Sequence, residues 1–392
     1  MGPALEAFRH EVRDFIAAYA PVIPPRAGVR SAENQTQLKA LQDWTSRLYG
    51  AGYAGADWPK EYGGRDDWSP EHGIVVGEEL ARARVPGVQG AGVLASHALV
   101  HYGTDEQRRR HLPEIRAGRQ LWCQLFSEPD AGSDLASLRT RAVRDGDAYV
   151  LNGQKVWTTD GHWAHFGYLL ARTDPDAPKH AGITALILDM STPGVTVRPL
   201  RELTGTSDFN EVFFDDVTVP VGAVIGSPGQ GWAIANATLA HERTSVGAVV
   251  VKLRLAVEAL IDLAGRVSIG GRAAIDNDRV RDRIGQFSAE VEALSALTAA
   301  NVTRWSRGTE RLHDAAMAKL MFSELNLQIA QFGVELAGDR GVLVEGDANV
   351  LDGGRWQDEW LYARAFTIAG GSSEIMRNLI AERGLALPRD KR

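Results

Sequence analysis

The feature that most constrains the fold is a block of short strand-forming segments between two blocks of helical periodicity. The segments 148–159, 165–173, 183–190, 195–200 and 210–220 are rich in Val, Thr, Phe and Tyr, and Asp-Gly, Asn-Gly and Pro-Gly turns separate them. This pattern of short strands and turns predicts an antiparallel β-domain and not a βαβ fold.

The flanking blocks carry apolar residues at helical spacing. Before the strands, Ser69 and Thr104 are typical N-caps, and Pro70 suits the first helical position. After the strands, residues 231–267 fit one helix longer than 25 residues, and two further helices follow. The short apolar run 366–369, before two glycines, is typical of a strand.

The order of these blocks predicts an α+β multidomain protein. We expect an N-terminal all-α domain over residues 1–119, a middle antiparallel β-domain over 120–229, and a C-terminal four-helix bundle over 230–392.

Charge and composition exclude several classes of function. The 392 residues carry a net charge of −7, which argues against nucleic acid or an anionic membrane as a partner. The single cysteine, Cys123, cannot form an internal disulfide or a thiolate metal cluster, so we expect a reducing, cytoplasmic environment. No run approaches the roughly 18 apolar residues of a membrane span. No residues have metal-ligand spacing, and dinucleotide and P-loop motifs are absent.

Two stretches suggest a ligand site. In the first, residues 124–140, a strand ends and a loop with Gly132 and Ser133 offers open amides and hydroxyls, which can bind anions or hydrogen-bond a heterocycle. In the second, Trp157 is followed by Thr158 and Thr159, so that a flat apolar face lies beside a hydroxyl donor. Both have ordinary alternatives, a plain turn and a core tryptophan.

Four motifs in order, "SEPDAGSD", "NGQKVWTT", "HERT" and "GGSSEIMRN", make the chain resemble the acyl-CoA dehydrogenase family, and the likeness extends along nearly all of it. The resemblance implies non-covalently bound FAD and, usually, a homotetramer. It also implies oxidation of the Cα–Cβ bond of an acyl-CoA to a trans-2-enoyl-CoA. The electrons would pass to an electron-transferring flavoprotein.

The resemblance also implies roles for particular residues. By position, FAD would be contacted by Phe126, Ser127, Gly132, Ser133, Trp157, Thr158, Thr159, Arg266, Ile269, Glu335, Gly338, Ser372 and Glu374. Phe126 and Ser127 would meet the pyrimidine edge of the flavin. Trp157 would flank the isoalloxazine, and Thr159 would lie near N5, which accepts the hydride. Ser133 would lie near both the pyrophosphate and the acyl-CoA.

Some positions depart from the family pattern. Arg266 matches an arginine that reaches the FAD of a neighbouring subunit, but Ile269 stands where the family usually has phenylalanine. Glu335 replaces the family's glutamine, which places an acid near a phosphate. Ser372 and Glu374 fall where the family contacts the adenosine side of the flavin.

The reaction needs a carboxylate base, because the α-proton of a thioester is only weakly acidic. Gly370 stands where many family members carry that glutamate. Other members supply it from an "ER" pair, which here is Glu242 and Arg243. Glu242 would share a helix face with Leu239 and valines at i+4 and i+7, where an unpaired carboxylate is costly. The resemblance therefore implies Glu242 as the base, and an ion pair with Arg243 or another basic residue is the alternative.

The resemblance implies a substrate site that includes Ser133, Arg243, Gly370 and Gly371. Since Gly370 leaves space where the usual acid would project, we hypothesise a substrate that is branched or bulky near the α-carbon. Two other functions stay open: a flavin oxidase or monooxygenase on the same fold, and a non-catalytic subunit of a mixed tetramer.

Overall fold

The computed structural model describes residues 2–23, 31–88, 90–242, 246–311 and 313–388. These residues form two compact units. Unit 1 comprises Met1–Arg30, Ser69–Pro86 and Arg243–Arg392, and unit 2 comprises Ser31–Trp68 and Gly87–Glu242. The first predicted domain, residues 1–119, thus contributes to both units, and the predicted boundaries at 119 and 229 stay a prediction.

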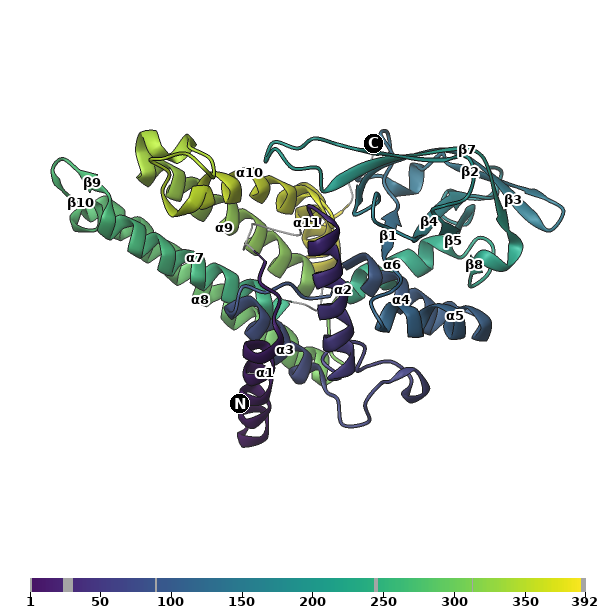
Figure 1. Cartoon of the computed structure of the whole chain (residues 1–392), viewed down its shortest axis with the longest axis horizontal. Coiled ribbons are helices and arrows are strands. Elements are labelled where there is room, and N and C mark those ends of the chain that lie inside the picture. Colours follow the sequence, from purple (N-terminus) through teal and green to yellow (C-terminus); the bar gives the residue numbers. More distant parts are fainter. Residues whose placement is uncertain (1, 24–30, 89, 243–245, 312, 389–392) are drawn as a thin grey trace. The chain divides into compact units, whose positions relative to one another are not determined.

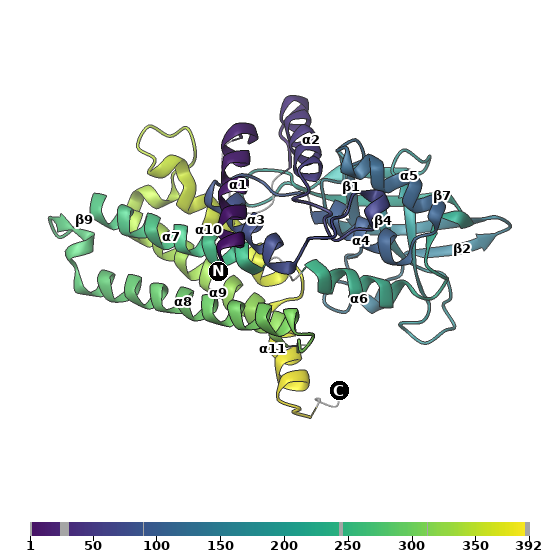
Figure 2. The ribbon, with the colours of Figure 1, turned by 90° about the horizontal axis from the view of Figure 1, so that it is seen from below.

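Unit 1 is helical, apart from one short β-hairpin. Its elements are α1 (Pro3–Tyr19), α3 (Pro70–Arg82), α7 (Val246–Arg266), β9 (Ser268–Ile269), β10 (Arg272–Ala273), α8 (Asp278–Ser306), α9 (Asp314–Ala337), α10 (Arg355–Ile368) and α11 (Ser373–Leu379). Figures 1 and 2 show α7 and α8 running side by side in opposite directions, with the β9–β10 hairpin at their far end.

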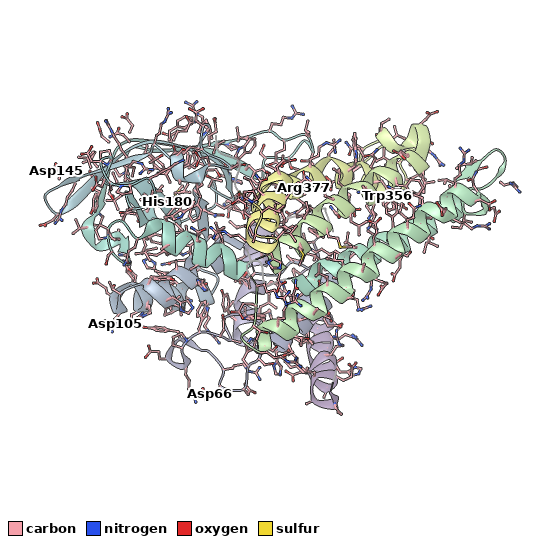
Figure 3. All side chains as sticks on the ribbon, turned by 180° about the vertical axis from the view of Figure 1, so that it is seen from behind. Asp66, Asp105, Asp145, His180, Trp356 and Arg377 are labelled. Carbon is pink, nitrogen blue, oxygen red and sulfur yellow. The ribbon has the colours of Figure 1, made fainter. Side chains whose placement is uncertain are left out.

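Helices α7 to α10 pack around one apolar core, as the predicted helical bundle requires. Leu260, Phe287 and Trp356 are among its buried residues. Gly333 of α9 allows the close approach of α10, because a Cβ at this position would lie 2.0 Å from the Trp356 ring. Figure 3 labels Trp356 on α10. The predicted starts are confirmed where the structure describes them: Ser69 caps α3, which begins at Pro70, and Thr104 caps the next predicted helix.

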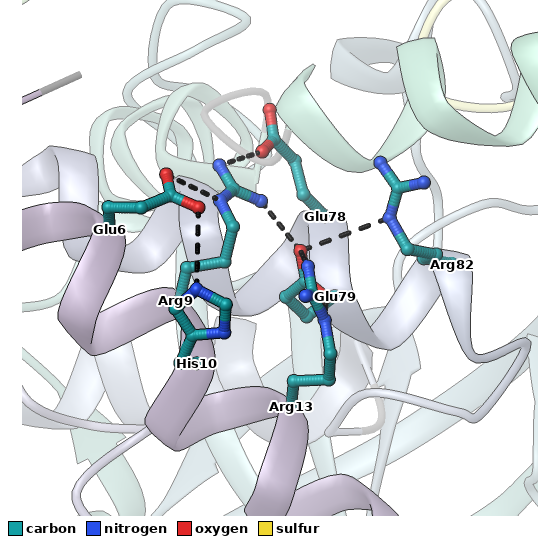
Figure 4. A network of polar contacts seen from close by, with 7 residues as sticks. All are labelled: Glu6, Arg9, His10, Arg13, Glu78, Glu79 and Arg82. Carbon is teal, nitrogen blue, oxygen red and sulfur yellow. Dashed lines mark hydrogen bonds and ion pairs between the residues drawn. The ribbon is translucent and has the colours of Figure 1, made fainter.

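A buried charged network joins α1 to α3 (Figure 4). The Glu79 side chain is only 2% exposed and accepts hydrogen bonds from Arg9 Nη1 at 2.7 Å and from Arg13 Nε at 3.0 Å. Arg9 also donates to Glu78 at 2.7 Å. Since two arginines from α1 converge on one carboxylate of α3, this network fixes the position of α1 within unit 1.

Unit 2 contains the predicted β-block, and helices complete it. Its helices are α2 (Gln35–Gly50), α4 (Gly90–Tyr102), α5 (Asp105–Arg116) and α6 (Gly231–Glu242). Its strands are β1 (Trp122–Leu125), β2 (Arg141–Asp145), β3 (Ala148–Thr159), β4 (Phe166–Arg172), β5 (Ile183–Asp189), β6 (Val195–Pro199), β7 (Phe209–Pro220) and β8 (Val224–Ile225).

The strands form one sheet in the order β6-β7-β3-β2-β4-β5-β8, and β1 also pairs with β4. Most pairs are antiparallel, as predicted, but β1 pairs with β4 in parallel, and a parallel bridge joins Arg141 of β2 to Arg172 of β4. One face of the sheet is covered by an apolar core that includes residues of α4 and α6, such as Leu94, Leu99 and Ile234.

The structure bears on two further predicted elements. The strand expected at 366–369 is wrong, because Phe366–Ile368 form the last turn of α10. The single helix expected over 231–267 is described as α6 and α7, and the segment 243–245 between them lies outside the described residues. None of the described helices has the length and apolar character needed to span a membrane.

Candidate cofactor and substrate site

The most unusual backbone in unit 2 is at Trp157, on strand β3. Trp157 has φ +60°, in the left-handed region that bulky residues rarely adopt. The pairing of β3 with β7 shifts here, because Lys155 pairs with Val212 whereas Thr158 pairs with Asn210. One extra residue on β3 is a β-bulge, a feature that re-aims a side chain. The bulge therefore turns Trp157 outward.

The bulge separates the exposed from the buried side chains of this segment. Trp157 is 61% exposed, although its ring also contacts Phe209 edge-on at 6.1 Å. Thr159, two residues further along the strand, is half-buried. Thr158 is fully buried, and its hydroxyl has no hydrogen-bond partner among the described residues. An exposed indole face next to threonine hydroxyls suits a flat heteroaromatic ring with a polar edge.

The loop after β1 lies beside this bulge. The backbone N–H of Val156 donates to the carbonyl of Ser127 at 2.9 Å, which joins the end of β1 to β3. Phe126 is buried against the Tyr168 ring, with ring centroids 4.9 Å apart. Further along, Gly132 and Ser133 are exposed at the tip of the loop. The structure therefore brings Phe126 and Ser127 next to the Trp157 bulge, within one unit.

Two residues that the sequence reasoning missed hold this loop. Lys155 and Glu128 form a buried ion pair at 2.8 Å, with side chains 0% and 8% exposed. Burial lowers the pKa of Lys155 to about 8 in spite of the neighbouring carboxylate. Burial alone would raise the pKa of Glu128. The charge of Lys155 and its hydrogen bond outweigh the effect of burial, so the pKa of Glu128 lies below its usual range. No local pattern marks Lys155 as buried, because it follows the polar Gln154 in the strand.

The glycine pair that follows α10 in unit 1 has a defined geometry. Gly370 and Gly371 have φ +66° and +98°, and a Cβ built on Gly370 would meet no atom within 4 Å. Lys319 Nζ donates to the Gly371 carbonyl at 2.6 Å. Ser372 caps α11 by accepting from the N–H of Ile375 at 3.3 Å, and Glu374 in the first turn is exposed. Gly370 is exposed, and its predicted place in the substrate site stays a prediction.

A second group in unit 1 surrounds Arg266. Its guanidinium donates to Asp262 at 2.9 Å and to both oxygens of Asp352 at 2.8 and 3.0 Å. Ile269 on the β9–β10 hairpin is 44% exposed. Arg266 is thus charge-compensated by two carboxylates within its own unit.

The remaining two predicted residues of unit 1 lie at the end of α9. Glu335 accepts from Gln331 at 2.9 Å, and Gly338 follows the helix with φ +57°.

The predicted base lies at the end of α6. Glu242 is the last residue of α6 and lies one turn after the fully buried Thr238. Leu239 packs against the apolar core of unit 2. The side chain of Glu242 and the whole of Arg243 lie outside the described residues.

Comparison with known proteins gives a consistent result along the chain. Three family models match: the acyl-CoA dehydrogenase N-terminal domain over residues 2–119, the middle domain over 123–217, and the C-terminal domain over 229–385. Acyl-CoA dehydrogenase IpdE1 of Mycobacterium tuberculosis is 39% identical over 393 residues, which cover 98% of each chain. Acyl-CoA dehydrogenase FadE34 of the same organism is 40% identical over 87% of this chain but only 46% of its own length.

Solved structures agree with these matches. A structure described as the Tcur3481-Tcur3483 steroid ACAD has a TM-score of 0.88 at 28% identity, covering 100% of this chain and 99% of that chain. The ChsE4-ChsE5 complex from Mycobacterium tuberculosis has a TM-score of 0.84 at 30% identity, with 100% and 99% coverage.

Proposed function

Because the chain belongs to the acyl-CoA dehydrogenase family of FAD-dependent enzymes, we propose that it oxidises an acyl-CoA with a branched or ring-bearing acyl group to the trans-2-enoyl-CoA. The observation that carries the cofactor part of this proposal is the left-handed bulge at Trp157. Such strain persists at ligand sites because surrounding structure and function maintain it.

The residues of unit 2 fit FAD. Trp157 and Thr159 of β3, with Ser127 at the adjoining loop, would hold the flavin ring, and Ser133 at the loop tip would lie near the pyrophosphate. When bound, FAD supplies the acceptor for the hydride that leaves Cβ. Ser372, Glu374, Arg266 and the other positions of unit 1 remain proposed contacts.

The chain itself must supply the base. We assign removal of the α-proton to the carboxylate of Glu242, which would accept that proton directly. Arg243 would orient the acyl-CoA, together with Gly370 and Gly371. Support for this assignment is the absence of an acid at residue 370 and the position of residue 242 on the helix that packs against the core of unit 2.

The proposed substrate class rests on Gly370. Because this residue has no side chain where many family members carry the base, we propose an acyl group with a branch or ring near the reacting carbon. The similarity to a structure described as a steroid ACAD supports a ring-bearing substrate.

Anaerobic titration of the flavin-loaded protein with straight-chain, α-methyl and ring-bearing acyl-CoAs tests this proposal. We expect bleaching of the flavin absorbance with the α-methyl or ring-bearing compounds at concentrations at least roughly tenfold lower than with straight chains. Equal response to straight chains would contradict the substrate class, and no bleaching with any acyl-CoA would favour the non-catalytic subunit.

We propose an electron-transferring flavoprotein as the acceptor, a homo-oligomer as the assembly, and a cytoplasmic location. Oxygen consumption during turnover without an added acceptor would instead indicate an oxidase or monooxygenase. Native mass spectrometry of the purified protein would give the assembly.

Substitution of Trp157 separates the ligand role of this residue from its structural role. Trp157→Gly has two opposing effects on stability. It relieves the left-handed strain in the folded state, which stabilises, and it gives the unfolded chain more freedom, which destabilises. The free energy of unfolding without FAD is therefore expected to stay within about 1 kcal/mol of wild type. FAD affinity is expected to fall, because the exposed indole face is lost. Trp157→Phe, which retains an aromatic face, should keep most of that affinity. Calorimetry of the FAD-free protein and flavin fluorescence titration measure the two effects, and unchanged affinity in Trp157→Gly would contradict the assignment.

A further inference from the structure

The buried cation Lys155 has no part in the chemistry proposed above, yet it is fully enclosed in unit 2. Its Nζ donates to the carbonyl of Phe126 at 2.8 Å and to Glu128 Oε1 at 2.8 Å. Phe126 precedes Ser127, which lies at the proposed flavin edge. Lys155 therefore reaches from the strand that carries Trp157 back to the end of β1.

Glu128 uses its two oxygens for the other end of the same loop. Oε1 accepts from the backbone N–H of Thr140 at 2.9 Å, and Oε2 accepts from the N–H of Arg139 at 2.6 Å. Residues 128 and 140 are the two ends of the loop whose tip carries Ser133. The ion pair thus connects four points of backbone: residue 126, both ends of the loop, and the strand just before the bulge.

Energetics argue that this pair serves geometry more than stability. A buried ion pair loses hydration on both sides, and well-packed apolar residues of similar volume are often as stabilising. An apolar pair, however, could not accept hydrogen bonds from the N–H groups of residues 139 and 140, and it could not donate one to the carbonyl of residue 126. These directional bonds fix the loop relative to the strand.

We propose that Lys155 and Glu128 are positioning residues that hold the Ser127–Ser133 loop and the Trp157 bulge in a single geometry for FAD. They act through the residues that would contact the cofactor and touch neither cofactor nor substrate themselves. This inference rests on the proposed function only in taking FAD as the ligand of the loop and bulge.

The test dilutes the purified, flavin-loaded protein and measures the release of FAD by flavin fluorescence. Lys155→Met, which is similar in length and uncharged, is expected to raise the FAD dissociation constant by roughly tenfold or more. Glu128→Gln keeps the volume and one acceptor oxygen, so it is expected to cause a smaller rise. Both changes break the same ion pair. The double variant should therefore release FAD less readily than the sum of the two single effects predicts.

A matched control comes from unit 1, where Asp314 is 5% exposed and pairs with Arg304 at 2.7 Å. Asp314→Asn should lower the melting temperature as much as the Lys155 and Glu128 changes do, but leave FAD release unchanged. Visible circular dichroism of the bound flavin should change in Lys155→Met and not in Asp314→Asn.

Two results would overturn the proposal: FAD release within twofold of wild type in Lys155→Met, or an equal effect in Asp314→Asn. If Lys155→Met does not fold, Glu128→Gln is judged by the same criteria. Wild-type protein that binds no FAD would instead refute the proposed function, so the two failures are distinguishable.

Discussion

Replacing Glu242 with glutamine is expected to slow flavin reduction by acyl-CoA by a factor of about 10²–10⁴, the usual contribution of a positioned general base. Glutamine has nearly the same shape as glutamate but cannot take up the α-proton. FAD binding should be unchanged, because the proposed flavin contacts in unit 2 lie on β3 and the loop after β1. Stopped-flow absorbance of the flavin under anaerobic conditions measures the rate.

Glu258→Gln is the matched control, since Glu258 is an exposed acid on α7, the helix that follows. It should reduce at the wild-type rate. If Glu242→Gln also reduces within about twofold of wild type, the base lies elsewhere, and the alternative of an ion pair for Glu242 is favoured. The pH dependence of the rate gives a second check, because Glu242→Gln should lose the acidic limb that a titrating base produces.

The second large effect concerns stability. Glu79→Gln is expected to destabilise the attachment of α1 to α3 by about 2 kcal/mol, because Arg9 and Arg13 lose their charge-assisted hydrogen bonds to the buried carboxylate, although Arg9 keeps its pair with Glu78. Hydrogen exchange of the α1 amides should accelerate by about 30-fold, the factor that corresponds to this energy. Glu114→Gln, which removes an exposed pair with Arg119, should leave exchange nearly unchanged. Equal protection of α1 in wild type and Glu79→Gln would show that the network contributes nothing.

The same network has a pH dependence with a defined sign. Burial raises the pKa of Glu79, but hydrogen bonds from Arg13 and Arg9 outweigh it, so the pKa is lower in the folded state than in the unfolded chain. The unfolded state therefore binds more protons near pH 4.5, and the stabilisation is present above that pH and lost as pH falls through the lower, folded pKa. Glu79→Gln should lack this loss on acidification.

The sequence predicts a helix or strand well where neighbouring residues alone determine it. The Ser69–Pro70 pair marks the start of α3, and the segment 148–159 coincides with β3. The strand prediction for the apolar run 366–369 is wrong because such a short run fits a strand or a helix end equally, and the packing of α10 against α9 decides between them. The parallel pairing of β1 with β4 joins strands about 40 residues apart in the sequence, which no local pattern specifies.

The candidate site divides in the same way. The motif around Trp157 could be recognised, but its outward direction could not, since the bulge exists only in the pairing of β3 with β7. In the sequence, Glu128 belongs to a loop motif and Lys155 to a strand segment. Their contact depends on the fold of the loop over the strand, and the distance between them in the sequence hides it.

The backbone at residue 157 has an evolutionary consequence. Glycine and asparagine adopt φ +60° at little cost, whereas a large aromatic residue there is strained by roughly 1–2 kcal/mol. A descendant chain that no longer carried a cofactor would have no functional reason to keep a strained aromatic residue at this position, so a less strained residue such as asparagine would be tolerated there. The identity of the residue at the bulge should therefore distinguish homologous subunits that carry flavin from those that have lost it.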